Sequence, residues 1–363
     1  MKLMSKNKTL WKLFTDFWSV FSILYIFICG FVAIFAYVLA PDSSKNANTM
    51  HLSIHSKPPM FSVEILTLPE DEALFSFGNY FIGSEQMKTE VPIKQYYTDE
   101  NGIYYTLYQE EGEGQKEFIS FSEFPEKNPQ EIVNKYISQK TFWLGTDKYG
   151  RDMLSRMLVG TRISFFIGFV AVFISLIIGT LLGLLSGYYG GKIDAFILWL
   201  INVTWSIPTL LLVIAFTLAL GKGYWQVFVA VGLTMWVEVA RIVRGQTLSV
   251  KNMQYIEAAK VLGFSDFRIL FRHILPNSMA PLWVIAASNF ASAILIESGL
   301  SFLGIGAQPP TPSWGGIIKD HYYYIAFGKA YLAIVPGVAI MLLVLSFMLI
   351  SNKLRDIFFC INN

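Results

Sequence analysis

The side chains that could carry covalent or metal chemistry are few in this sequence, and they lie far apart. The four histidines are His51, His55, His273 and His321. The two cysteines, Cys29 and Cys360, fit no metal-ligand or C-x-x-C spacing. A membrane-embedded enzyme would need His, Ser or acidic groups that converge within its spans, and no such cluster is evident. We therefore expect no catalytic residue, no metal site and no cofactor on this chain.

Phosphate-binding chemistry is also missing from the sequence. Three Gly-Lys pairs occur: Gly191-Lys192, Gly221-Lys222 and Gly328-Lys329. None continues to Ser or Thr, and no G-x-x-x-x-G-K-[ST] phosphate loop is present. If the protein drives transport, its energy must come from another subunit.

One segment, residues 252–276, carries a dense set of helix signals. Asn252 is expected to cap a first helix. Gly263 suits the left-handed position just past the end of that helix. Ser265 is expected to cap a second helix, and Pro276 either ends it or begins the next element. The segment therefore predicts a helix, a turn and a second helix.

The second helix of this segment has an apolar face at i, i+3, i+4, i+7 spacing: Phe267, Leu270, Phe271 and Ile274. Arg268 and Arg272 share another face. A DNA-binding helix-turn-helix is one alternative, but its place between two apolar spans disfavours it. An amphipathic helix at the membrane surface is a second alternative.

The elements that must position this segment are predicted to be membrane helices. The chain of 363 residues is 54% hydrophobic, only 15% charged, and has a net charge of +2. Charge-free runs of 25, 29, 27, 15, 24 and 23 residues follow Asp16, Arg162, Asp194, Lys222, Arg272 and Lys329. A spanning helix needs about 20 mostly apolar residues. The composition excludes an ordinary soluble enzyme and predicts an all-α membrane protein with six transmembrane helices. The fourth run reaches this length if Glu238 and Arg241 lie at the membrane interface.

Basic residues assign an orientation to these spans. Residues 1–16, the 238–283 loop and the 353–363 tail are rich in Lys and Arg, which favours the cytoplasmic side. We expect a cytoplasmic segment 1–16, a helix over 17–40, an extracytoplasmic insertion over 41–150, a core over 151–352 with five further spans, and a cytoplasmic tail over 353–363. The first span is read as a retained helix, since it exceeds a signal peptide's apolar region.

The 41–150 insertion is acidic and predicts some β-structure. Val91–Thr98 and Ile103–Gln109 are rich in Tyr, Thr and Ile, and Asp99-Glu-Asn-Gly102 separates them. This pattern is typical of a hairpin with an Asn-Gly turn. A membrane receptor that senses a ligand through this insertion is an alternative function, although the chain offers no sizeable cytoplasmic effector domain.

Small residues and prolines mark the spans themselves. Gly179, Gly183 and Gly187 recur every four residues, so they share a face on which another helix can approach closely. Pro208 and Pro336 lie within the third and sixth spans, where kinks are expected. Glu238 and Glu297 are placed at span ends, so the spans are expected to contain little buried charge.

The 252–276 segment resembles the EAA loop of binding-protein-dependent ABC importer permeases. The match consists of Glu257-Ala258-Ala259, then Gly263 after three intervening residues, then, after nine more residues, a four-residue close that ends in Leu275-Pro276. His273 stands where the general pattern has Ile, whereas Arg272-His-Ile-Leu-Pro-Asn277 resembles the oligopeptide, dipeptide and nickel branch. The resemblance implies that the loop docks on an ATP-binding subunit through Glu257, Ala258, Ala259, Gly263, Phe264, Phe267, Arg268 and Phe271.

Two outer segments resemble the same branch. The first is Leu144–Arg156, in which Asp147 with Arg151 and Asp152 with Arg156 form i, i+4 pairs that are expected to stabilise a short interfacial helix. The second is Gly299–Gly315. The family motif residues in the two segments are Gly145, Thr146, Asp147, Gly150, Arg151, Asp152, Arg156, Gly304, Pro309, Pro310, Trp314 and Gly315.

The resemblance implies a type I importer permease in a bacterial plasma membrane. The partners it implies are a second homologous permease, two ATP-binding subunits, an extracytoplasmic solute-binding protein and membrane lipid, with no nucleic acid. The resemblance also implies that ATP and Mg²⁺ bind to the ATP-binding subunits and not to this chain. Oligopeptides or dipeptides are the expected solutes, and nickel or another small solute is the alternative.

Overall fold

The computed structural model describes residues 12–69, 78–85, 89–112, 114–221 and 223–359. Most of the expected 1–16 segment, together with Lys222 and Cys360, lies outside these residues. By internal contacts the chain divides into two units. The helical unit comprises Met1–Gly30, Ile163–Gln308 and Val338–Asn363, and the sheet unit comprises Phe31–Arg162 and Pro309–Gly337.

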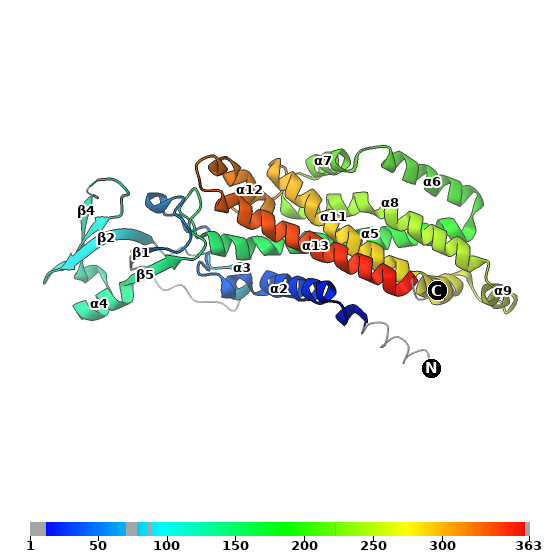
Figure 1. Ribbon diagram of the computed structural model, residues 1–363, viewed down its shortest axis with the longest axis horizontal. Helices are drawn as coiled ribbons and strands as arrows, with labels where there is room; N and C mark the ends of the chain where they lie inside the picture. Colours follow the sequence, from blue (N-terminus) through cyan, green and yellow to red (C-terminus); the bar gives the residue numbers. More distant parts are fainter. Residues whose placement is uncertain (1–11, 70–77, 86–88, 113, 222, 360–363) are drawn as a thin grey trace. The chain divides into compact units, whose positions relative to one another are not determined.

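The sheet unit contains one antiparallel sheet of five strands in the order β4-β3-β2-β1-β5 (Figure 1). The strands are β1 (Phe61–Thr67), β2 (Glu90–Thr98), β3 (Gly102–Leu107), β4 (Lys116–Ser120) and β5 (Ile137–Phe142). The Asp99 carboxylate accepts hydrogen bonds from the backbone N–H groups of Asn101 (2.8 Å) and Gly102 (2.9 Å), which closes the β2–β3 turn. The expected hairpin is therefore confirmed.

A small hydrophobic core holds this sheet together without disulfides among the described residues. Leu66, Ile93, Ile103 and Ile119 from four strands pack with Ile132 of α4 (Pro129–Tyr136). Alternating apolar positions on the strands supply this face, because successive side chains of a strand point to opposite sides. The Asn128 side chain caps α4 by accepting from the Gln130 N–H at 3.1 Å.

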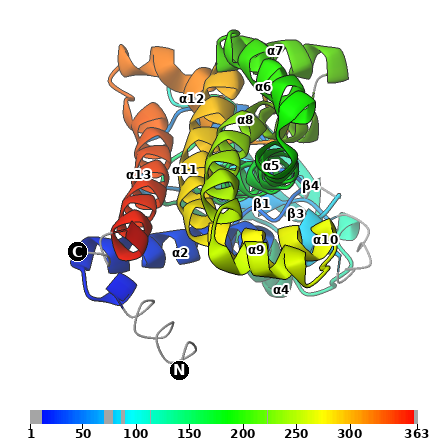
Figure 2. The ribbon, with the colours of Figure 1, turned by 90° about the vertical axis from the view of Figure 1, so that its right-hand side faces the viewer.

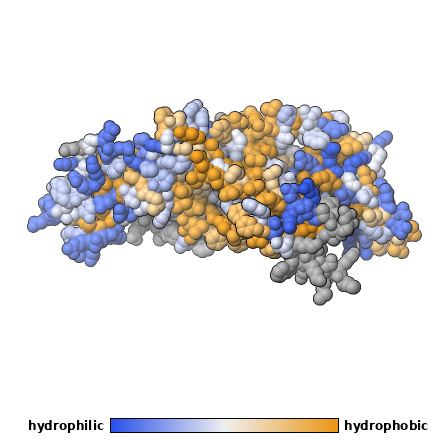
Figure 3. Space-filling model, in the orientation of Figure 1, coloured by the Kyte–Doolittle hydropathy of each residue, from blue (hydrophilic) through white to orange (hydrophobic). Residues whose placement is uncertain are grey.

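Five described helices are long and apolar enough to span a membrane. They are α2 (Phe17–Leu39), α5 (Met153–Tyr189), α8 (Tyr224–Lys251), α11 (Leu275–Phe302) and α13 (Tyr331–Phe359). Helix α13 passes residue 352, where the expected tail begins. Apolar side chains cover the exposed faces of the long helices (Figure 3).

The third expected span is broken rather than straight. It consists of α6 (Gly191–Trp205) and α7 (Thr209–Leu220), which are bent by 92° and count as a sixth span only as a pair. The break falls at Pro208, which lacks a backbone N–H and disfavours the helical conformation of the residue before it. Helix α13 continues through Pro336.

Helix α6 is fastened to α8 by an ion pair. The Arg244 guanidinium donates to both carboxylate oxygens of Asp194 at 2.7 Å, and the Ser186 hydroxyl at the end of α5 also donates to Asp194. A bidentate Arg–carboxylate contact fixes orientation as well as distance.

The expectation that Glu238 lies at a span end is wrong, because it lies at the middle of the 28-residue α8.

The remaining elements are short. They are α3 (Asn79–Ile82), α9 (Gln254–Val261), α10 (Asp266–Ile269), a π-helical turn (Leu270–Ile274), α12 (Trp314–His321), and 3₁₀ turns at Lys12–Phe14, Leu52–Ile54, Phe121–Glu123 and Tyr322–Ile325. Helices α9 and α10 lie at one end of the helical unit, beside the end of α8 (Figure 2).

Candidate functional site: the loop between two membrane helices

The loop begins where α8 ends. Asn252 terminates α8, and its backbone N–H donates to the Val250 carbonyl. Met253 precedes α9 and makes no side-chain cap. The expectation that Asn252 caps the first loop helix is therefore wrong, because the chain is still leaving α8 at that position.

Helix α9 ends in a Schellman motif centred on Gly263. Gly263 has φ +76°, its N–H donates to the Lys260 carbonyl at 2.9 Å, and the Phe264 N–H donates to the Ala259 carbonyl at 3.1 Å. These two bonds satisfy carbonyls that a helix end leaves free. The left-handed glycine expected from the sequence is confirmed, and it sets the direction in which the chain enters α10.

The second loop helix is continuous with the next membrane span. The Ser265 hydroxyl caps α10 by accepting from the Arg268 N–H at 3.4 Å, as expected. Helix α10 passes through the π-helical turn into α11 without a break. Pro276 lies in the first turn of α11, where its missing N–H costs little. Helix α10, the π-helical turn and α11 therefore form one continuous helical rod, Asp266–Phe302.

The expected apolar face of this second helix divides into a buried and an exposed pair. Leu270 and Ile274 are buried, whereas Phe267 is 70% exposed and Phe271 is 37% exposed. The two phenylalanine rings lie 4.5 Å apart. The prediction of one uniform apolar face is therefore wrong, because Leu270 and Ile274 pack in the cluster with Tyr188 whereas the two phenylalanines remain outside it.

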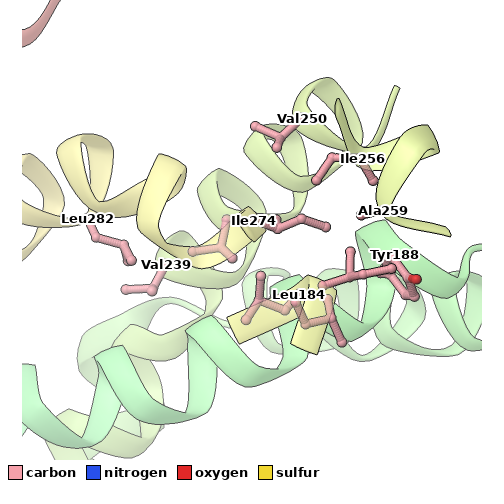
Figure 4. Close-up of a cluster of buried hydrophobic side chains, with 11 residues drawn as sticks. Leu184, Tyr188, Val239, Val250, Ile256, Ala259, Ile274 and Leu282 are labelled. Atoms are coloured by element: carbon pink, nitrogen blue, oxygen red, sulfur yellow. The ribbon is translucent and has the colours of Figure 1, made fainter. Parts of the chain in front are cut away.

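The buried side of the loop packs against the ends of α5 and α8. Ile256, Ala259 and Ile274 point toward Leu184 and Tyr188 of α5 in one hydrophobic cluster (Figure 4). A buried apolar cluster of this kind fixes the position of the loop relative to the spans.

Tyr188 links the loop to α5 by polar contacts that the sequence reasoning missed. Its hydroxyl donates to the Asp266 carboxylate at 2.6 Å, and its backbone carbonyl accepts from the Lys251 ammonium at 2.5 Å. The Lys260 ammonium lies 5.4 Å from the ring centroid. No sequence signal distinguishes this residue, which is one of 18 tyrosines.

The outer side of the loop is an exposed apolar tip, defined by Val261, Leu262, Phe267 and Phe271. Val261 is 88% exposed and Leu262 is 72% exposed. Contiguous apolar surface next to polar groups is typical of a protein contact site. Sequence reasoning did not single out Val261 or Leu262, although two apolar residues directly before a predicted helix-ending glycine are the available signal.

The residues next to this apolar tip include the charged side chains of Glu257 and Arg268. Glu257 and Ala258 are exposed, and within the described residues neither Lys251 nor Lys260 lies at ion-pair distance from Glu257. The Arg268 guanidinium lies 4.0 Å from the Phe264 ring centroid. The Glu257 carboxylate is thus exposed to solvent beside the tip.

The three-glycine face of α5 lies against α8. A Cβ atom at Gly179 would lie 2.5 Å from the Cβ of Val239, and one at Gly183 would lie 2.6 Å from the Ala240 carbonyl oxygen. Gly187 is equally crowded by α8. Real Cβ atoms do not approach other atoms so closely, so the two helices meet backbone to backbone.

In the sheet unit, residues 144–152 form a tight loop rather than a short helix, and α5 begins at Met153. Gly145 and Gly150 both have φ +74°, and a Cβ atom at either would collide with a backbone carbonyl oxygen. The Thr146 hydroxyl donates to the Ile54 carbonyl at 2.5 Å. The expected interfacial helix is wrong, because left-handed glycines interrupt helical geometry.

Asp147 organises this loop. Its buried carboxylate accepts from the Arg151 guanidinium at 2.6 Å, and Arg156 lies 3.5 Å away. Asp152 instead accepts from the Ser155 N–H at 2.9 Å at the start of α5. The i, i+4 spacing of Asp147 and Arg151 thus closes a turn, and Asp152 does not pair with Arg156 in the expected way.

The two outer segments are joined through their neighbouring residues within the sheet unit. The Trp314 indole N–H donates to the Met157 carbonyl at 3.1 Å, and Gly315 is buried beside it. The Lys148 ammonium pairs with Asp320 at 3.0 Å. Pro309 and Pro310, joined by a cis peptide bond, precede this contact, and Gly304 (φ +80°) follows α11 in the helical unit.

The long apolar helices define the class of protein as a multi-pass membrane protein. Residues 179–358 match the family model described as "Binding-protein-dependent transport system inner membrane component". The chain belongs to this family. It is a permease subunit of an ABC importer rather than an enzyme, and it associates with other subunits of such an importer.

Similar proteins are permeases named for peptides. The chain is 44% identical over 214 residues to a glutathione transport system permease protein of Pectobacterium atrosepticum, covering 59% of this chain and 71% of the relative. It is 39% identical over 238 residues to a dipeptide transport system permease protein of Alkalihalophilus pseudofirmus, covering 66% and 77%. The corresponding Bacillus subtilis protein is 37% identical over 238 residues, covering 64% and 74%. These relatives belong to the oligopeptide and dipeptide branch.

The solved structures that resemble the chain are more distant. An inward-facing methionine ABC transporter aligns with 56% of this chain and 97% of its own, with a TM-score of 0.47 and 20% identity.

Proposed function

We propose that this permease imports small peptides and that its loop transmits the action of ATP-binding subunits. The exposed apolar tip at Val261, Leu262, Phe267 and Phe271 is the observation that carries the proposal. Such a surface is costly to leave in water and is suited to the groove of a partner protein. The names of the relatives, which are dipeptide and glutathione permeases, support a peptide as the solute.

The buried side of the loop supports transmission. Ile256, Ala259 and Ile274 tie it to α5 and α8, and α10 runs continuously into α11. A partner that moves the tip therefore moves the rod Asp266–Phe302. Coupling of this kind needs a partner whose own ligand biases two arrangements, and ATP on the ATP-binding subunits supplies that bias.

The proposal includes an orientation. The basic loop and tail face the cytoplasm, and residues 41–150 face the opposite side, where a solute-binding protein docks. A second permease forms the pathway together with this chain. In a variant with Cys29 and Cys360 replaced by Ser, Glu100→Cys in the exposed hairpin turn should react with a membrane-impermeant thiol reagent on intact cells. Val261→Cys should react only after lysis. The opposite pattern would reverse the orientation.

Import itself is tested with the assembled complex in liposomes. We expect ATP-dependent uptake of labelled dipeptides or tripeptides, inhibited by unlabelled peptide and not by Ni²⁺. Leu262→Ser at the exposed tip should weaken retention of the ATP-binding subunits, whereas Leu218→Ser, at an exposed apolar position in α7, should not. Uptake of Ni²⁺ in place of peptide would refute the substrate, and unchanged retention would refute the docking surface.

A further inference from the structure

A polar cavity of about 220 Å³ borders the break between α6 and α7. It is lined from four helices of the helical unit, and its polar members are Thr204, Thr209, Thr234, Glu238 and Ser292. Figure 1 shows α6 and α7 lying along α8. Broken helices at membrane depth occur where backbone lines a cavity or a substrate site.

Glu238 is the one ionisable residue among those that line this cavity. It follows Tyr224, the first residue of α8, by 14 positions, which corresponds to roughly 21 Å along the helix axis. The hydrocarbon core is about 30 Å thick, so this carboxylate lies within the depth of the membrane rather than at its edge. An ionisable group at such depth is expensive to keep and marks a pathway or a binding site.

Two of the threonines that line the cavity present acceptors rather than donors. The Thr204 hydroxyl donates to the Leu200 carbonyl at 2.9 Å, and the Thr234 hydroxyl donates to the Val231 carbonyl at 2.8 Å. Their hydroxyl protons are thus used within their own helices, and their oxygen lone pairs remain available. A ligand that donates hydrogen bonds fits this lining.

Nearby charges do not neutralise Glu238. Arg241 is three residues further along α8, but its guanidinium lies 3.9 Å from the Trp205 ring centroid. No ion pair between Glu238 and Arg241 occurs in the described chain. The end of α6 and the start of α7 carry opposite partial charges of about half a unit, which largely offset each other. Glu238 is therefore the charged side chain that lines the cavity, and Arg241 lies at the cavity border on the ring of Trp205 without pairing with Glu238.

We propose that Glu238 binds the protonated amino terminus of the peptide during its passage through the permease. The Thr204 and Thr234 hydroxyl oxygens serve as additional acceptors for the same ammonium group. This inference rests on the proposed function and adds to it a residue that favours a cationic solute group. Glu238 is exposed toward this cavity, and its carboxylate disfavours a solute that presents a carboxylate at the same place.

The test uses the complete importer in liposomes with trialanine as the solute. Glu238→Gln keeps the shape of the side chain and removes its charge, and Glu238→Asp restores the charge. We expect Glu238→Gln to lower kcat/KM for import about tenfold, since a charge-assisted hydrogen bond is lost. Glu238→Asp should recover most of this loss, and Asp356→Asn, at an exposed carboxylate in α13, should import as the wild type does.

Assembly is measured in the same preparations by co-purification of the second permease and of the ATP-binding subunits. Normal assembly with slow import supports the proposal. Loss of the second permease in Glu238→Gln would overturn it, because Glu238 would then pair with a cation across the subunit interface. Import by Glu238→Gln at the wild-type rate would overturn it while leaving peptide import intact. Absence of trialanine import by the wild type would overturn both.

A charge-rescue experiment gives an independent readout. In a variant with Cys29 and Cys360 replaced by Ser, Glu238→Cys is modified with a sulfonate-bearing methanethiosulfonate or with neutral methyl methanethiosulfonate. Recovery of import with the anionic reagent alone is expected. Equal import after either reagent would show that the charge is not used.

Discussion

Replacing Gly263 by valine tests the loop most directly. Gly263 has φ +76°, and a Cβ atom there would meet no atom within 4 Å. The effect of the substitution is therefore backbone strain and not a clash. Left-handed geometry costs an L-residue about 1–2 kcal/mol, and a β-branched side chain is the least suited to it. A cost of that size corresponds to a 5- to 30-fold shift in an equilibrium.

The strain is relieved if the Schellman bonds at Gly263 break and α10 leaves the turn in another direction. We then expect a chain that still inserts in the membrane, but that retains less ATP-binding subunit and transports less. Co-purification and uptake measure these two effects, and Gly263→Asn should be milder because Asn tolerates positive φ.

Gly245 in α8 provides the matched control for this substitution. A Cβ atom there also meets no atom within 4 Å, but Gly245 is helical and has no positive φ. Gly245→Val should therefore leave association and transport near the wild-type level. Glu257→Ala, which removes an exposed carboxylate beside the tip, should act like Gly263→Val but more weakly. Full association and full transport by Gly263→Val would show that the loop does not dock as proposed.

Two further predictions concern packing and pH. Gly183→Leu should force α5 away from the Ala240 backbone and destabilise the purified chain by about 1–3 kcal/mol. The measurement is the thermal midpoint of unfolding, which should fall. Gly337→Leu is the control and should leave the midpoint unchanged, because there is open space around Gly337. In the sheet unit, burial raises the pKa of Glu90, but a hydrogen bond from His51 (3.1 Å) and the Lys140 ammonium (2.7 Å) outweigh it and hold the pKa at about 2. Because this lies below the ordinary Glu value of about 4.3, the stabilisation is present above that pH and is lost as the pH falls toward 2. Pulsed hydrogen exchange after incubation across this pH range should show that the amides of β1 and β5 lose protection as the pH falls. Glu90→Gln should show no such pH-dependent loss, and a loss in this variant would contradict the role given to Glu90.

The sequence predicts the features that depend on local chain properties. Charge-free runs reveal the spans because the requirement for apolar length is intrinsic to each segment. The β2–β3 hairpin and the left-handed Gly263 are predicted for the same reason, since turn residues determine their own backbone. Pro208 predicts the position of the break in the third span but not its size, because the 92° bend depends on what packs against the two halves.

Features that depend on partners elsewhere in the chain are predicted poorly. The i, i+4 spacing of Asp147 and Arg151 fits a helix and a tight loop equally well, and two left-handed glycines select the loop. Likewise, the apolar spacing around Phe267 cannot show which members are buried, because the answer depends on Tyr188 and its neighbours in α5. Glu238 was misplaced because a charged residue ends an apolar run in a sequence, although it need not end a helix.

The loop and the proposed solute contact share one structural element. Ser292 and Ile296, which line the cavity, lie on α11, and α11 is continuous with α10 at the exposed tip. Under the proposed docking, a displacement of Phe267 by an ATP-binding subunit therefore reaches the cavity wall through the continuous helical segment Asp266–Phe302. The π-helical turn Leu270–Ile274 lies between tip and wall, and such turns are places where a helix bends most easily. If this turn stays straight, movement of the exposed tip also moves the cavity wall. The tip moves alone if the turn bends. Substitutions that stiffen it should alter the coupling of ATP hydrolysis to import without altering retention of the ATP-binding subunits.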